Sequence, residues 1–355
     1  MATTVTYDEL CLSISEDLAS ALEAGNLSRK PQRVGLLEAL LSPMNTTGVE
    51  IDDQLARDGK SNKVLLRHLV PDAEADSTDE ITSICDENGV EHAYVWSEVN
   101  ADMAAESETK LLTPDQVRGL CEDGSAFRAE LISLSLDSLR RNINAQLIPV
   151  FESGCGGILD GDGETGTTYN VIYTDDSGRR SALPQGLIDM EIDLDDVGMS
   201  ERPIIVGGGN IYLYTKEQGI SCCNDLGVDP STMDLQVFRD NQISKILTGP
   251  SYDNPFFAFA PQAAVFCPTP KNVGQFRMIT DTFIRDTIID PVTGLEVDFD
   301  LYYNYCANDS KGAWKFKTSL RFGLYQLPLT LFKSTDPRYK VNFNWSFRAG
   351  EISAA

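Results

Sequence analysis

The feature that most constrains the fold is a regular alternation of apolar and polar residues toward the carboxyl end. Residues 296–305, 314–324 and 341–347 place an apolar side chain at nearly every second position, and a turn-forming stretch, 308–312, separates the first two runs. A period of two is the period of an extended strand with one buried face. The sequence therefore predicts long antiparallel strands on a core, with residues such as Asp298 and Asp300 facing away from it.

Helical periodicity appears at the other end of the chain. Residues 7–23 carry an apolar stripe at four-residue steps, formed by Leu10, Ile14, Leu18 and Leu22, which predicts an amphipathic helix. A turn-forming stretch at 25–31 and a short apolar patch at 34–41 follow. We expect an arm, up to about residue 45, that has little core of its own and must pack against something else.

The longest helix is predicted at about residues 125–152. Its apolar residues recur every three to five positions and are Leu131, Leu136, Leu139, Ile143, Leu147 and Phe151. Its polar residues are expected on the opposite, solvent-facing side and are Arg128, Asp137, Arg140, Arg141 and Asn144. Pro149 is expected to kink or end the helix, because proline lacks the N–H group that a helix interior uses.

Shorter elements lie between these helices and the carboxyl-terminal strands. Two apolar runs joined by an acidic connector, 63–70 and 91–99, predict an extended two-stranded hairpin that needs a neighbour for stability. Thr113, Pro114 and Gln116 form a capping-box sequence that starts a helix. Further strands are predicted at 168–173, 187–194, 203–206 and, buried on both faces, 255–267.

Three consecutive glycines, 207–209, follow the strand at 203–206 and resemble the start of a phosphate-binding loop. The dinucleotide fingerprint requires a further glycine where Tyr212 stands, and the P-loop requires a Gly-Lys-Ser/Thr triplet that this segment lacks. We therefore predict a turn between a strand and a helix, in which glycine adopts backbone conformations that other residues resist. No nucleotide site is expected.

The remaining motifs do not match the patterns of catalytic or metal-binding sites. Residues 160–166 have spaced carboxylates, but Thr165 and Val171 stand where an EF-hand needs Gly and Glu, which leaves a weak calcium site as the alternative to a surface turn. The chain has two histidines, His68 and His92, and eight scattered cysteines without a Cys-x-x-Cys pair. We predict no catalytic, cofactor-binding or metal-binding residues and no cofactor.

Size and charge exclude some classes of protein. A chain of 355 residues can bury a large core, and its net charge of −25 argues against a protein that reads nucleic acid. Neither a secretory signal nor an apolar run of roughly 20 residues, the length that spans a membrane, is present in the sequence. We expect a soluble protein that folds in a reducing cytosol.

The order of the predicted elements resembles that of the major capsid proteins of tailed bacteriophages, which have the Hong Kong 97 fold. The order is an N-terminal arm, an extended hairpin, a long helix, a turn-rich domain entered by an apolar strand, and long antiparallel strands. Three segments carry the resemblance: 203–208 before a helix, 257–265 with Gln262 where a glycine is expected, and 298–306 followed by 314–323.

The resemblance implies an α+β fold with named parts. These are an N-terminal arm (1–57), an extended E-loop hairpin (58–108), a peripheral domain (109–200 and 276–338) with a long spine helix and long antiparallel strands, and an axial domain (201–275 and 339–355). It also implies that the arm and the E-loop gain stability only on neighbouring subunits. We expect an ordered arm from which no segment is removed, and no covalent cross-link through Lys60, Lys63 or Lys110.

The same resemblance implies a structural protein and not an enzyme. The expected role is a subunit that self-assembles into hexamers and pentamers and forms the icosahedral head, or capsid shell, around the double-stranded DNA genome of a tailed bacteriophage. The expected partners are further copies of the chain, a portal, and scaffold or decoration proteins, with neither sequence-specific DNA binding nor a membrane. The expected location is the virion, after assembly in the cytoplasm of the host bacterium.

Two other functions remain open from the sequence. An encapsulin-like bacterial compartment shell protein would have the same fold, although its subunits are usually shorter. A non-viral β-rich ligand-binding or carbohydrate-binding protein would instead expose the aromatic side chains of 302–305 and 314–316 as a platform.

Overall fold

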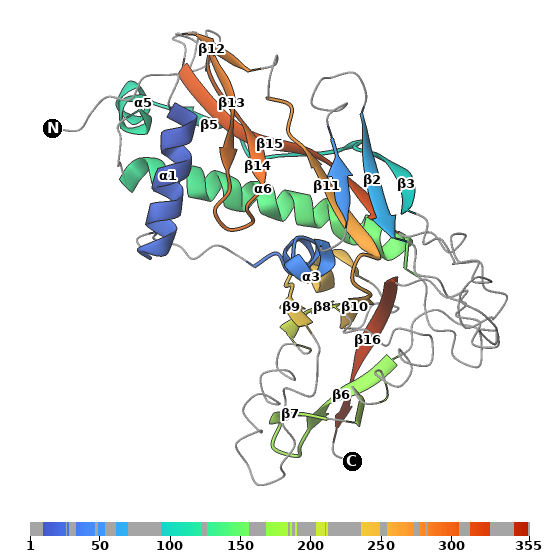
Figure 1. The fold of residues 1–355 in the computed structure, drawn as a ribbon. Helices are drawn as coiled ribbons and strands as arrows, with labels where there is room; N and C mark the ends of the chain where they lie inside the picture. Colours follow the sequence, from blue (N-terminus) through green and yellow to red (C-terminus); the bar gives the residue numbers. More distant parts are fainter. Residues whose placement is uncertain are drawn as a thin grey trace, which may run out of the picture.

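The computed structural model describes a mixed helix and sheet protein built around two large sheets and one long helix (Figure 1). The residues that it describes are 10–25, 27, 33–46, 49–53, 62–69, 94–121, 126–155, 168–183, 185–186, 189, 204–209, 211, 236–248, 254–272, 277–280, 283–304, 313–326 and 344–353.

The predicted carboxyl-terminal strands form most of a seven-stranded sheet. β14 (Glu296–Asn304) and β15 (Ala313–Gln326) pair antiparallel, with Asp300 opposite Lys317. The sheet order is β11 (Ala264–Thr269), β15, β14, β13 (Phe283–Ile289) and β12 (Met278–Thr280). β4 (Met103–Glu106) and β5 (Lys110–Leu112) pair with the other edge of β15. The prediction of antiparallel strands on a core is confirmed for β14 and β15, because Phe299, Leu301, Phe316 and Leu320 are buried.

The polar face of β14 differs from the prediction. Asp298 and Asp300 are buried rather than solvent-facing. The cause is the segment after β11, in which Lys271 and Asn272 donate their backbone N–H groups to Asp298 Oδ1, each at 2.8 Å. This segment covers the face of β14 that the alternation assigned to solvent.

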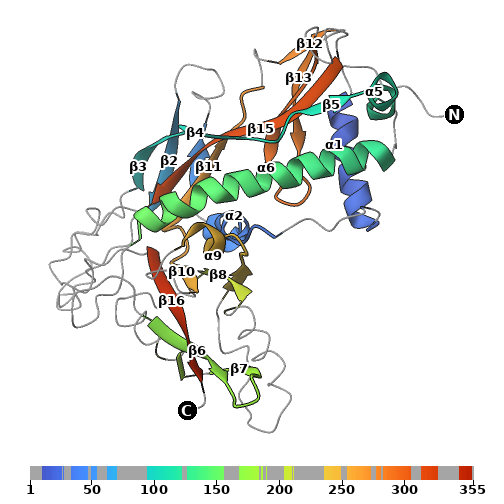
Figure 2. The same cartoon turned by 180° about the vertical axis from the view of Figure 1, so that it is seen from behind.

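The long helix is α6 (Ala126–Ser153), and it runs along the seven-stranded sheet (Figure 2). Its predicted span is confirmed, but the helix does not end at Pro149. Pro149 is exposed, and Phe151 after it is fully buried, with its ring 4.9 Å from that of Phe257. Packing of Phe151 holds the last turn in place, while the proline interrupts the hydrogen bonding on the solvent side.

The N-terminal helix α1 (Leu10–Glu23) packs across α6 and β13 of the same chain. Leu10, Ile14 and Leu18 are buried in the main core, as the predicted stripe requires, whereas Leu22 is only partly buried. α2 (Gly35–Leu40) is buried in the same core, and α3 (Pro43–Thr46) follows it. The expectation that the arm is stabilised only by other subunits is therefore wrong for these helices.

The predicted hairpin is confirmed at its base. β2 (Lys63–Leu69) pairs antiparallel with β3 (Tyr94–Asn100), and β1 (Glu50–Asp52) adds a third strand on β2. Val64, Leu66 and Val99 pack on Val265 and Tyr325 of the large sheet. The base thus has a core within its own chain, contrary to expectation, and the connector at 70–93 lies outside the described residues.

A six-stranded sheet forms the second part of the molecule. Its order is β7 (Arg180–Ala182), β6 (Thr168–Thr174), β16 (Asn344–Ser353), β10 (Pro255–Phe259), β8 (Ile204–Gly207) and β9 (Gln236–Arg239). β16 pairs antiparallel with β10 but parallel with β6, so the third alternating run is not purely antiparallel and lies in a different sheet from β14 and β15. Residues 341–343 of that run lie outside the described part.

The apolar run predicted as one strand at 255–267 is divided between the two sheets. β10 belongs to the six-stranded sheet and β11 to the seven-stranded sheet. The turn between them contains Pro261 and Gln262, and Gln262 has a φ of 67°. A left-handed backbone explains why a glycine was expected there.

Two shorter predictions have different outcomes. α5 (Pro114–Leu120) starts with the predicted capping box, in which Thr113 and Gln116 exchange hydrogen bonds. The strand predicted at 187–194 is wrong at Asp189, the one residue of that range that the structure describes, because Asp189 is helical like Gln185 and Gly186. α9 (Ile243–Ile246) is a single turn after β9.

Candidate functional site

Within the described residues, His, Cys, Asp and Glu side chains form no group of three that could hold a metal ion. The four described cysteines, Cys11, Cys121, Cys155 and Cys267, are free thiols. Burial raises the pKa of Cys11 far above its usual range and that of Cys267 to about 12, which keeps both protonated and unreactive. The calcium-like segment 160–166, His92 and two cysteines that are adjacent in the sequence, Cys222 and Cys223, lie outside the described part.

The glycines after β8 serve close packing. The backbone φ of Gly207, Gly208 and Gly209 is not positive, so the reason given from the sequence for these residues is wrong. A Cβ atom on Gly207 would lie 2.9 Å from Cβ of Phe256 and 3.1 Å from a side-chain carbon of Ile211. Gly207 therefore allows β8 to approach β10 and the helical residue Ile211.

Helix α6 buries polar residues that the sequence pattern assigned to solvent. Arg128, Arg140 and Asn144 are each at most 3% exposed, whereas Phe127 and Leu134 are more than a third exposed. Arg128 donates its Nε to Asp17 Oδ2 at 2.8 Å and an Nη2 hydrogen to Ser13 Oγ at 2.7 Å, both on α1. The helix is covered on most sides, and its polar residues meet partners on the covering elements.

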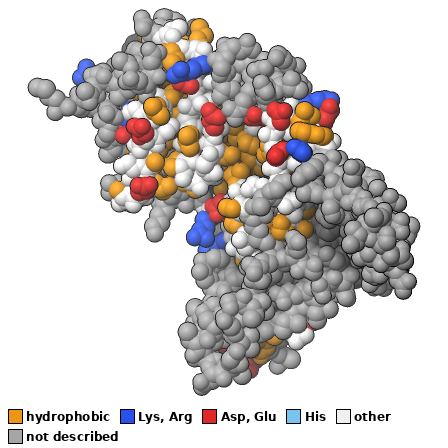
Figure 3. All heavy atoms as spheres, in the orientation of Figure 1, with side chains coloured by type: hydrophobic (Ala, Val, Ile, Leu, Met, Phe, Trp, Pro, Cys, Tyr) orange, Lys and Arg blue, Asp and Glu red, His pale blue; other side chains and the backbone are white. Residues whose placement is uncertain are grey.

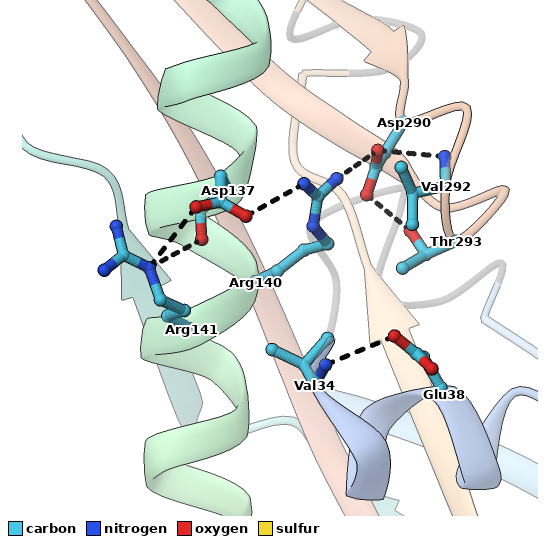
Figure 4. A network of polar contacts seen from close by, with 8 residues as sticks. All are labelled: Val34, Glu38, Asp137, Arg140, Arg141, Asp290, Val292 and Thr293. Carbon is cyan, nitrogen blue, oxygen red and sulfur yellow. Dashed lines mark hydrogen bonds and ion pairs between the residues drawn. The ribbon is translucent and has the colours of Figure 1, made fainter. Parts of the chain in front are cut away.

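Arg140 connects α6 to the turn between β13 and β14 (Figure 4). Its Nη1 donates to Asp290 Oδ1 at 2.7 Å, and its Nη2 donates to Asp137 Oδ1 at 3.3 Å. Asp290 also accepts hydrogen bonds from the backbone N–H of Val292 at 3.2 Å and from Thr293 Oγ1 at 2.7 Å. Burial of both charged groups makes their pairing obligatory, because a lone buried charge is strongly destabilising.

Asp240 is the centre of a second buried network. It is fully buried at the end of β9, and its Oδ2 accepts hydrogen bonds from Asn144 Nδ2 at 2.8 Å and the Leu36 N–H at 3.0 Å. Its Oδ1 accepts from the Gln242 N–H at 2.7 Å. Asn144 Oδ1 in turn accepts from the Leu37 N–H at 3.1 Å. One carboxylate thus joins the long helix, the arm and the six-stranded sheet.

The base of the hairpin presents one polar and aromatic face. Glu50, Arg67 and Trp96 stand opposite one another on β1, β2 and β3. Arg67 donates to Glu50 at 3.2 Å and lies over the Trp96 ring at 5.7 Å, and Trp96 is 56% exposed. On the same sheet Lys63 pairs with Glu98. An exposed Trp stacked on Arg is typical of contact surfaces between proteins.

A groove of about 420 Å³ lies between α2 and α3, β9 and the turn at 292–293. Glu38 is the one charged residue among those that line it, and Leu41, Val237 and Val292 are among its apolar walls. Glu38 Oε1 accepts the N–H of Val34 at 3.2 Å, so one of its oxygens is already engaged (Figure 4). On the face drawn in Figure 3, acidic side chains are spread over the described surface, with hydrophobic side chains between them near the middle of the view.

None of the helices in the described ranges is long and apolar enough to cross a bilayer. No family model and no curated protein sequence matches the chain.

Solved structures from bacteriophages are similar to this chain. A structure of Mycobacterium phage Che8 matches with 12% identity and a TM-score of 0.41 over 90% of this chain and 93% of the other. The cyanophage A-1(L) capsid asymmetric unit matches with 13% identity and a TM-score of 0.44 over 91% and 94%. The head structure of Helicobacter pylori bacteriophage KHP40 matches with 8% identity and a TM-score of 0.33 over 80% and 83%.

Proposed function

We propose that this chain is the structural subunit of a tailed-bacteriophage head. Copies of it self-assemble into hexamers and pentamers that close an icosahedral shell around a double-stranded DNA genome. The observation that carries the proposal is the arrangement of four parts: α1 on the long helix α6, α6 along the sheet of β11–β15, the β2–β3 hairpin at one end of that sheet, and the separate sheet around β16. This arrangement supports the proposal, because it follows the order of parts that the resemblance to the Hong Kong 97 fold implies.

The bounds implied by the resemblance are an N-terminal arm (1–57), an E-loop (58–108), a peripheral domain (109–200 and 276–338) and an axial domain (201–275 and 339–355), and we propose these domains with two changes. Strand pairing places two parts of the chain with the other domain from the one that these bounds assign. β6 and β7 join the sheet of β16, and β11 joins that of β15. We therefore propose that the axial domain includes β6 and β7, and that its boundary with the peripheral domain is the turn at Gln262.

The proposed role is structural and not catalytic, and it needs no cofactor. Its partners are other copies of the chain, a portal, and scaffold or decoration proteins, and its location is the virion after assembly in the bacterial cytoplasm. The net charge of −25 supports enclosure of DNA without sequence-specific binding, because a surface of like charge does not hold phosphates.

The carbohydrate-platform alternative is disfavoured by the burial of its aromatic residues. Phe316 is fully buried in the core of the large sheet. Tyr303 and Trp314 are partly buried and pack edge-on against each other, with ring centroids 5.7 Å apart. A binding platform needs flat exposed rings, which this pair does not present.

The test is the assembly state of the purified chain, followed by light scattering and negative-stain electron microscopy. Rings of five or six copies, or closed shells, support the proposal, and a monomer at every concentration and salt condition contradicts it. Particles isolated from the native source then separate a phage head from an encapsulin-like shell, because the former protects double-stranded DNA from nuclease and the latter holds protein cargo.

A further inference from the structure

The segment 34–46, which contains α2 and α3, lies between the two sheets and is bonded to both. α2 contacts β8 and β9 of the six-stranded sheet, β11 of the seven-stranded sheet, and α6. Leu36, Leu37 and Leu40 are fully buried in the core that these elements share. A short helix filled with leucine thus occupies the space that separates the sheets.

One end of this segment is held by the six-stranded sheet. Val34 forms an isolated antiparallel bridge with Asp240, and the Leu36 N–H donates to Asp240 Oδ2 at 3.0 Å. Gly35 lies so close to Arg239 that an added Cβ atom would be 2.6 Å from its carbonyl carbon and oxygen. No side chain fits at Gly35, so the start of α2 packs directly against the backbone at the end of β9.

The other end is held by the turn that connects the sheets. Asn45 is fully buried, and its Oδ1 accepts the Gln262 N–H at 3.0 Å. Its Nδ2 donates to the carbonyl oxygens of Ala264 at 2.7 Å and of Leu40 at 3.0 Å. Gln262 is the residue with a φ of 67°, a conformation that a non-glycine side chain disfavours.

We propose that residues 34–46 are a strut that sets the angle between the two sheets, with Asn45 as the latch that fixes the strut to the connecting turn. The turn at 260–263 is a covalent hinge, because it is the short peptide link between β10 and β11. Asn45 keeps this hinge in its left-handed conformation. This role of residues 34–46 lies within one subunit and does not depend on whether the chain builds a shell.

If Asn45 holds residues 34–46 in place, its loss has an effect that the loss of a purely local hydrogen bond does not have. If Asn45 only satisfies the turn, its loss affects the amides near 262–266. If it latches a strut, its loss also frees the far end, where the amides of Leu36 and Leu37 are bonded to Asp240 and Asn144. Hydrogen exchange read by mass spectrometry on the full chain distinguishes the two, through peptides covering 34–41, 239–247 and 256–268.

Asn45→Ala is expected to raise the hydrogen-exchange rate at least tenfold in all three peptides. A tenfold faster rate corresponds to a free energy of local opening that is lower by about 1.4 kcal/mol. The matched control is Thr46→Ala on the same helix, whose hydroxyl donates, among the described residues, to the carbonyl oxygens of Ser42 and Pro43. It is expected to leave the three peptides within twofold of wild type. Faster exchange confined to 256–268 in Asn45→Ala overturns the strut.

A second variant decides the question even where Asn45→Ala does not fold. Gln262→Gly keeps the backbone N–H that Asn45 accepts and removes the disfavoured conformation. The strut predicts wild-type exchange at 34–41 and 239–247, because the latch is intact. A tenfold increase there shows that the turn, and not the strut, sets the angle, and contradicts the proposal.

Discussion

Asn144 on α6 donates its Nδ2 to Asp240 Oδ2 at 2.8 Å, and this bond joins the long helix to the end of β9 across a fully buried site. The same carboxylate binds the Leu36 N–H of the arm. Three segments separated by 96 residues or more in sequence meet at one side chain. This contact thus joins α2, α6 and the end of β9 at one buried carboxylate.

Asp240→Ala is predicted to lower the free energy of unfolding by about 2–4 kcal/mol, because the buried Leu36 N–H loses its acceptor and Asn144 Nδ2 loses one of its two acceptors, keeping Gln242 Oε1. Chemical denaturation followed by tryptophan fluorescence measures the loss. Asn142→Ala is the control, since Asn142 is an exposed neighbour on α6 with one bond, to the Glu106 carbonyl, and it is expected to cost about 1 kcal/mol or less. Equal losses for the two variants would show that Asp240 is not a central contact.

Arg140→Met is predicted to destabilise the chain by about 3–5 kcal/mol, because Asp290 would remain buried without its cation. Arg141→Met, at the adjacent position, removes a guanidinium that is 42% exposed and is expected to cost about 1 kcal/mol or less. The double variant Arg140→Met with Asp290→Asn is expected to lose less than the sum of the two single losses. Additive losses would mean that the two charges do not depend on each other.

Asp298 is predicted to make stability depend on pH. Burial raises its pKa to about 6, against the opposing effect of the N–H groups of Asn272 and Lys271. A carboxyl whose pKa is higher when folded than when unfolded contributes stability below the unfolded pKa, near 4, and loses it as the pH rises through 6. Nearby charges include Asp300, which also raises this pKa, and Lys271, which lowers it.

The measurement is the free energy of unfolding of wild type and of Asp298→Asn between pH 4 and 7. Asparagine keeps an acceptor for Lys271 and Asn272 but carries no charge, so the variant gains on the order of 2–3 kcal/mol relative to wild type as the pH rises. Parallel pH profiles for the two proteins would show that Asp298 does not titrate in this range.

Gly207→Ala is predicted to be destabilising by about 1–3 kcal/mol, because the new Cβ atom would lie 2.9 Å from Cβ of Phe256. Gly209→Ala is the control, since a Cβ atom there meets nothing within 4 Å. Thermal unfolding of the two variants side by side separates close packing at Gly207 from a general need for flexible residues in the turn. A larger loss at Gly209 would contradict the packing explanation.

The sequence predicted the elements whose periodicity is long and regular. The stripe of Leu10, Ile14 and Leu18, the alternation along β14 and β15, and the span of α6 follow from the spacing of side chains that share one face. These patterns are local and correctly identify the apolar face of each element, although the rest of the chain can cover the opposite face, as it does at Asp298 and Asp300 of β14.

The buried polar contacts could not be predicted in the same way. The spacing of apolar residues on α6 predicts that Arg128, Arg140 and Asn144 face solvent. Their partners lie instead on α1, in the β13–β14 turn and at the end of β9, which are distant in the sequence. The division of 255–267 into two strands occurs at a turn in which Gln262 has a left-handed φ. A glycine at this position would have indicated the turn, but a glutamine does not. The functional resemblance came from the order of elements, since no single residue carries it.

The most direct measurement of the central claim is electron cryomicroscopy of the purified chain under conditions that favour association. The proposal predicts closed shells made of rings of five and six copies, with the β2–β3 hairpin and its exposed Trp96 at contacts between subunits. A chain that remains a monodisperse monomer, or that assembles into particles without five-fold and six-fold rings, would contradict the proposal.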